Sequence, residues 1–197
     1  TDGRIMAWMF DTFTMNKAHS VLGVVTGKPL TIGGSLGRTE ATSRGALYCT
    51  RDALAKQGRS LGDMRVAVQG FGNVGSYYAK FIAEDGAKVV ALSDSSVPLH
   101  NEHGIDVHAA IAHKHETGSL EGLKGAETIT NEELVLVDCD ILAPCALEQV
   151  ITEDNASQVK ARIIVEGANG PVTPLADSIL EDMGVLVLPD VLANAGG

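Results

Sequence analysis

The chain lacks the cysteine patterns that mark disulfide-rich or zinc-binding proteins. Its 197 residues include only three cysteines, Cys49, Cys139 and Cys145, an odd number with no Cys-x-x-Cys spacing. We therefore expect free, buried thiols in a protein kept in a reducing compartment, and hence a cytoplasmic location. No metal site is expected from these residues.

Long apolar runs and an excess of positive charge are also missing. No run approaches the ~18 apolar residues that a membrane span needs, and Thr1 to Arg4 do not begin a signal peptide. The 25 acidic and 15 basic residues give a formal net charge of −10, which repels nucleic-acid phosphates and anionic lipids. We expect neither nucleic acid nor a membrane surface as a partner.

What the chain does have is a 45% apolar composition and a regular alternation of strands and helices. Such alternation predicts an α/β fold, a Rossmann-like doubly wound, mostly parallel sheet with helices on both faces. Helices are expected over residues 4–13 and 39–57 and after Thr173-Pro174, a cap followed by proline. The expected strands span residues 65–69, 88–94, 140–143, 162–166 and 185–189.

A stretch of loop-forming residues predicts where the chain divides into two parts. Residues 21–37 are rich in glycine, proline and threonine, a composition typical of loops. We expect a helical segment over residues 1–22 and one main domain over residues 23–197.

A glycine fingerprint follows the strand at residues 65–69. Its glycines have the spacing G-x-G-x-x-G and precede a helix, and the next strand ends with an acidic residue, Asp94. In such a turn, backbone amides at the start of the helix bind a pyrophosphate. We therefore expect a dinucleotide-binding site. The turn consists of Gly70, Phe71, Gly72, Asn73, Val74 and Gly75.

Asp94 is the residue expected to select the cofactor. At the end of the second strand its carboxylate would accept hydrogen bonds from the adenosine ribose, which favours NAD because a 2′-phosphate would be repelled. Ser95 and Ser96 follow and would donate to that same phosphate, so NADP also stays open. The alternative is that Asp94 is an ordinary turn carboxylate.

Several further motifs occur in a fixed order along nearly the whole chain. Together they resemble the coenzyme-binding domain of hexameric glutamate dehydrogenases, in the Glu/Leu/Phe/Val dehydrogenase family. The Arg-x-Glu-Ala-Thr run separates the chain from the leucine, phenylalanine and valine enzymes. The motifs are Thr26-Gly27-Lys28-Pro29, Gly33-Gly34-Ser35, Gly37-Arg38-Thr39-Glu40-Ala41-Thr42, the glycine turn, Glu166-Gly167-Ala168-Asn169-Gly170-Pro171 and Asp190-x-x-Ala193-Asn194-Ala195-Gly196-Gly197.

The resemblance implies a cofactor role for ten residues besides the glycines. They would bind the nicotinamide end (Arg38, Thr42), the pyrophosphate (Asn73, Val74), the adenosine ribose (Asp94, Ser95), the length of the dinucleotide (Ala143, Ala146) and the nicotinamide ribose or amide (Asn169, Asn194). Judged from the residues alone, Thr42 is a hydroxyl inside a helix, and the two asparagines form turns beside glycine.

The resemblance also implies an activity, the reversible oxidative deamination of L-glutamate to 2-oxoglutarate and ammonia by a homo-hexamer with NAD or NADP. The family's catalytic and substrate-binding residues have no counterpart here, so we expect a chain truncated at both ends and, alone, inactive. Two alternatives stay open. One is a dinucleotide-sensing module without catalysis, and the other is a branched-chain or aromatic amino acid dehydrogenase.

Two further groups of residues are expected to have no role in chemistry. The histidines at positions 100–115 have no zinc spacing and are interpreted as a solvated helix face. Lys28 precedes a proline in a surface turn, and the resemblance gives it no catalytic role.

Overall fold

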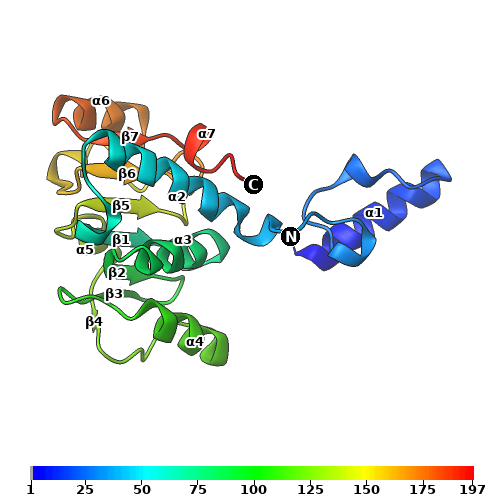
Figure 1. Ribbon diagram of the computed structural model, residues 1–197, viewed down its shortest axis with the longest axis horizontal. Coiled ribbons are helices and arrows are strands. Elements are labelled where there is room, and N and C mark those ends of the chain that lie inside the picture. The colour runs from blue at the N-terminus through cyan, green and yellow to red at the C-terminus, as the bar shows by residue number, and fades with distance from the viewer. Residues whose placement is uncertain (1) are drawn as a thin grey trace. The chain divides into compact units, whose positions relative to one another are not determined.

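The computed structural model describes residues 2–197 and divides them into two compact units. The first unit ends at Ala41, and the second comprises residues 42–197. Helix α2 (Arg38–Lys56) begins in the first unit and continues into the second (Figure 1). A boundary near residue 22 was expected instead.

The first unit is small and built around helix α1 (Gly3–Lys17). The Asp2 carboxylate caps this helix by accepting from the Ile5 amide at 2.9 Å. The glycine- and proline-rich stretch does not belong to the main domain, because it packs back on α1, with the Gly27 carbonyl close to Gly3. The two compact units therefore divide after that stretch, between residues 41 and 42, and not before it. Its short helices are η1 (Leu22–Val24) and η2 (Leu30–Ile32).

The second unit contains a seven-stranded sheet with the order β4-β3-β2-β1-β5-β6-β7. The strands that sequence patterns predicted are present, with ends within one residue of the expected ones. The strands are β1 (Arg65–Gln69), β2 (Lys88–Ser93), β3 (Pro98–His100), β4 (Glu127–Thr128), β5 (Ile141–Pro144), β6 (Ile163–Val165) and β7 (Leu186–Leu188).

Strand β1 lies at the point where the strand order reverses. It pairs in parallel with β2 on one side and with β5 on the other, so that Val66 faces both Val89 and Ile141. Strands β6 and β7 continue the parallel sheet beyond β5. The predicted doubly wound, mostly parallel sheet is confirmed. In such sheets ligands bind at the carboxyl ends of the strands, beside this reversal.

The edge beside β2 differs from the expectation, because β3 and β4 are antiparallel. The Asp94 amide donates to the Val97 carbonyl at 3.1 Å and closes a tight turn after β2. A connection this short permits only a hairpin, since a parallel return needs a crossover of a dozen or more residues. His100 therefore lies in a strand, paired with Glu127, and its placement on a helix face was wrong.

Each face of the sheet packs against its own set of helices. Val66 and Val68 of β1 point into a core shared with α2, α3 and α4, whereas Ala67 points into a second core with α5 and α6. This alternation explains why β1 is apolar on both faces. The helices, in addition to α2, are α3 (Asn73–Glu84), α4 (Val107–Thr117), α5 (Asn131–Val135), α6 (Pro174–Asp182) and α7 (Asp190–Ala193), with short turns η3 (Leu61–Asp63) and η4 (Ala156–Gln158).

Three smaller expectations can be compared with this fold. Thr173 caps α6 and Pro174 is its first residue, as predicted. Cys49, Cys139 and Cys145 are free thiols, of which Cys139 is buried and the other two are partly exposed. Over residues 2–197, no helix has the length and apolar character needed to cross a membrane.

Candidate functional site

The three glycines of the turn after β1 have different surroundings. Gly70 has a φ of +94°, and its amide donates to the Ser93 hydroxyl at 3.0 Å. A Cβ on Gly70 would clash with the Ala146 methyl, and one on Gly75 would overlap the Gly70 carbonyl oxygen. A Cβ on Gly72, in contrast, would meet no atom within 4 Å. Packing thus requires the first and third glycines, while the second borders open space.

That open space lies at the start of helix α3. Gly72 is the N-cap, no side chain caps the helix, and the first turn carries no acidic residue. The first helical hydrogen bond runs from the Ser76 amide to the Gly72 carbonyl. The amides of Asn73 and Val74 therefore remain available for an anion, favoured further by the helix dipole.

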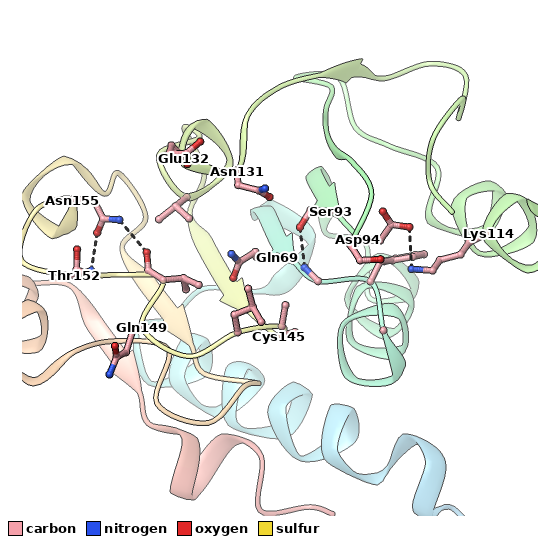
Figure 2. Close-up of a pocket in the computed structure, with 18 residues that line it drawn as sticks. Gln69, Ser93, Asp94, Lys114, Asn131, Glu132, Cys145, Gln149, Thr152 and Asn155 are labelled. Atoms are coloured by element: carbon pink, nitrogen blue, oxygen red, sulfur yellow. Dashed lines mark hydrogen bonds and ion pairs between the residues drawn. The ribbon is translucent and has the colours of Figure 1, made fainter. Parts of the chain in front are cut away.

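A cavity of about 830 Å³ opens at the carboxyl ends of β1, β2 and β5 (Figure 2). This volume lies in the ordinary range for small-molecule and cofactor sites. Of the predicted site residues, six line it, namely Gly70, Phe71, Gly72, Asp94, Ser95 and Ala146. The lining residues that sequence reasoning missed include Gln69, Ser93, Lys114, Asn131, Glu132, Gln149, Val150 and Asn155.

Asp94 is held by four donors. Its Oδ1 accepts from the amides of Ser96 and Val97 at 2.8 and 3.1 Å. Its Oδ2 accepts from the Leu120 amide at 2.8 Å and pairs with Lys114 Nζ at 3.1 Å (Figure 2). Burial alone would raise the pKa of Asp94, but the three amides and the ammonium outweigh it and lower that pKa below its ordinary value.

These contacts argue against the role expected of Asp94. A carboxylate has about four acceptor positions, and here each has a donor, while the side chain is only 1% exposed. Its oxygens have no free position for ribose hydroxyls. The structure therefore supports the other interpretation, a turn carboxylate that fixes the hairpin after β2. Ser95, which is exposed, lies at the cavity instead.

A second cluster of polar groups follows β6 and β7. Asn194 Nδ2 donates to Asn169 Oδ1 at 2.8 Å. Two further bonds link their loops: Glu166 Oε2 accepts from the Asp190 amide at 2.8 Å, and Asp190 Oδ2 accepts from the Gly170 amide at 2.9 Å. The two asparagines are thus brought together across 25 residues of sequence.

Glu166 is the buried member of this cluster. Burial raises the pKa of its carboxyl above the ordinary value, although the bond from the Asp190 amide acts in the opposite direction. Its position on the loop immediately after β6 lets one side chain fix the start of helix α7.

The two residues expected on α2 belong to different units. Arg38 lies in the first unit, at the beginning of the helix, and Thr42 is the first residue of the second. The next residue, Ser43, is fully buried and donates to the Val74 carbonyl at 2.7 Å, which ties α2 to the start of α3.

Two residues of the predicted set point into the core. Ala143 is 0% exposed inside β5, so its methyl does not border the cavity in the ligand-free chain. Phe71 is 2% exposed and packs in the core, with Lys114 Nζ 5.9 Å from its ring centroid. Lys114 had no local signal in the sequence. It lies about twenty residues beyond Asp94, and helix α4 brings it to the site.

The remaining candidates have structural partners. Lys28 Nζ donates to the carbonyls of Leu22 and Val25 at 2.7 and 2.8 Å, within its own turn. Within residues 2–197, no group of three or more histidine, cysteine, aspartate or glutamate side chains is arranged to hold a metal ion.

A doubly wound sheet with a glycine turn at its reversal and a cavity beside it defines a Rossmann-like domain of the nucleotide-binding class. The particular family follows from comparison with known proteins. The family model of the Glutamate/Leucine/Phenylalanine/Valine dehydrogenases matches residues 33–197, and the chain belongs to this family.

Individual relatives agree with that membership. The chain is 52% identical over its full length to a glutamate dehydrogenase of Thermotoga maritima, of which it covers 48%. Among solved structures, it is similar to a hetero-hexameric glutamate dehydrogenase from Thermus thermophilus (TM-score 0.91, 37% identity, 100% of this chain and 46% of that one). A glutamate dehydrogenase from Peptoniphilus asaccharolyticus gives a TM-score of 0.79 at 35% identity, with the same coverage. The chain thus spans about half the length of these relatives.

Proposed function

We propose that the chain is the dinucleotide-binding domain of a glutamate dehydrogenase. The complete enzyme would catalyse the reversible oxidative deamination of L-glutamate to 2-oxoglutarate and ammonia. The observation that carries this proposal is the glycine turn, whose open Gly72 and uncapped α3 N-terminus lie beside a cofactor-sized cavity. The 52% identity to a glutamate dehydrogenase favours glutamate among the family's substrates.

The residues present fit a nicotinamide dinucleotide, which would supply the hydride acceptor. The amides of Asn73 and Val74 would bind its pyrophosphate, and bare backbone at Gly72 would let that group approach closely. Thr42, Asn169 and Asn194 would orient the nicotinamide end. Short hydroxyl and amide side chains suit this task because they fix a polar ring without adding charge.

The family uses NAD or NADP, and we propose that this chain accepts both. The preference expected for NAD depended on repulsion between a free Asp94 carboxylate and the 2′-phosphate of NADP. Because Lys114 is paired with Asp94 at 3.1 Å, the local charge is largely balanced. Ser95, exposed at the same cavity, is available to a hydroxyl or a phosphate.

The assembly and location of the complete protein are also part of the proposal. The Thermus thermophilus relative is a hetero-hexamer, and we infer a hexamer for the complete protein here, with identical chains as the resemblance implies. A cytoplasmic location is consistent with the three free cysteines.

Calorimetry and a spectroscopic assay together test this function. The 197-residue chain should bind NAD, but it should show no glutamate-dependent formation of reduced nicotinamide. Deamination needs a positioned base and a cation for the α-carboxylate, whereas Lys28 and Lys114 are engaged by backbone carbonyls and by Asp94. Absence of NAD binding would refute the proposal. Glutamate turnover lost in Thr42→Ala would place a complete active site in this chain.

A further inference from the structure

Gln69 is the last residue of β1 and reaches the cavity from its floor. Its backbone lies between Ser93 of β2 and Pro144 of β5 in the parallel register. The residue is only 7% exposed and lines the cavity. In Figure 2 its side-chain amide projects from the end of β1 into the middle of the site. It is therefore buried within the protein yet directed at the ligand space.

The side-chain oxygen of Gln69 has no hydrogen-bond donor among residues 2–197. Most buried polar atoms in folded proteins have a partner, and leaving one without a partner costs stability. An apolar side chain of similar length would fill the same space without that cost. The orphaned acceptor therefore indicates a donor that is not part of the chain.

Three other polar side chains near this point already have partners. The Ser93 hydroxyl accepts from the Gly70 amide, and both oxygens of Asp94 have donors. Asn155 bonds locally, with Oδ1 accepting from the Thr152 amide and Nδ2 donating to the Val150 carbonyl. Of the side chains at the floor of the cavity, Gln69 is the buried one whose oxygen has no donor in the part of the chain that the structure describes.

The shape of the cavity indicates which part of a ligand reaches Gln69. Gly72, the N-cap of α3, lines the cavity together with Ser93 and Ser95. The cavity continues past Gln69 toward α5 and the 149–155 turn, where Val135 and Val150 provide apolar surface. A flat apolar base that is joined to the phosphates through a ribose would extend in this direction.

We propose that Gln69 Oε1 accepts a hydrogen bond from an O–H or N–H of the adenosine half of a bound dinucleotide, in the place that sequence reasoning gave to Asp94. The inference rests on the proposed function and adds to it a binding residue. It also explains why a glutamine, with its unpaired oxygen, occupies a core position of β1.

Two apolar variants and one control variant test this role. Gln69→Met and Gln69→Leu remove the acceptor while keeping most of the volume. The control, Gln158→Met, changes an exposed glutamine on η4 outside the cavity. Calorimetry with NAD and with ADP should give affinities lowered about fivefold or more in both Gln69 variants, the loss expected of one hydrogen bond. Inorganic pyrophosphate, which lacks adenosine, should bind with the same dissociation constant in all proteins.

Thermal unfolding of the ligand-free chain provides an independent measurement. The Gln69 variants should melt at the same temperature as the unchanged chain or higher, because the unpaired acceptor is gone. Unchanged ADP affinity in the variants would overturn the inference while leaving the proposed function intact. Lowered melting temperature, or failure of both variants to fold, would mean that a buried water or the fold itself uses the amide, and would also overturn it. If the unchanged chain bound neither NAD nor ADP, the proposed function and the inference would both fail.

Discussion

Asn194 donates a hydrogen bond from its side-chain amide to the side-chain oxygen of Asn169, at 2.8 Å. Each of these residues follows a different parallel strand, and each lies in a motif that the sequence shares with glutamate dehydrogenases. The bonds from the Asp190 amide to Glu166 and from the Gly170 amide to Asp190 hold the two loops around them. The pair is thus prearranged in the absence of any ligand, which suits residues that orient a cofactor.

Asn194→Ala should weaken the binding of NAD about fivefold and leave the binding of ADP unchanged. The loss corresponds to one hydrogen bond, about 1 kcal/mol, and ADP lacks the nicotinamide end that the asparagines are proposed to orient. Calorimetric titration with the two ligands measures both values. Equal weakening of NAD and ADP would instead mean that Asn194 acts on the whole domain.

Glu166→Gln should alter the pH dependence of stability. The folded-state pKa of Glu166 is raised, so its contribution to stability is fully present below the unfolded-state value, about 4.3, and is lost as the pH rises through the folded-state value. Relative to the unchanged chain, Glu166→Gln should therefore gain stability as the pH rises through this interval. Urea unfolding at several pH values gives the difference, and a difference independent of pH would contradict the burial described here.

Asp94→Asn should show the opposite dependence. The folded-state pKa of Asp94 is lowered, so its contribution is present above the unfolded-state value, about 3.9, and is lost as the pH falls through the folded-state value. At neutral pH we expect a destabilisation of about 1–3 kcal/mol, because an amide cannot serve all four donors. The same urea titrations measure it. A variant that is fully stable but binds NAD much more weakly would return Asp94 to the role of a ribose ligand.

The features that local sequence dictates were predicted well. The strand, the glycine turn and the following helix are specified by adjacent residues, so β1, Gly70–Gly75 and α3 could be placed in advance. The hairpin after β2 was missed because it depends on how the Asp94 side chain folds back on Ser96 and Val97.

The less predictable part of the site comes from elements distant in sequence. Lys114 reaches the cavity on α4 and pairs with Asp94, and this contact alone changes the interpretation of that carboxylate. Gln69 was not recognised because a glutamine at the end of an apolar strand has no distinctive pattern; only its burial and its unpaired oxygen distinguish it. For Ala143 the resemblance gives a position along the chain and not its burial, which only the fold shows.

The claim that the cavity binds a dinucleotide through the glycine turn is tested most directly by calorimetry of NAD with Gly72→Ala. The new methyl meets no protein atom, and replacing Gly by Ala at an N-cap costs about 1 kcal/mol at most, so the chain should stay folded. Gly23→Ala, at another glycine with open space around it, is the control. We predict that the unchanged chain and Gly23→Ala bind NAD alike, and that Gly72→Ala binds at least tenfold more weakly, about 1.4 kcal/mol, because its methyl occupies the space of the pyrophosphate. Equal affinity in all three proteins, or no binding by the unchanged chain, would contradict the account.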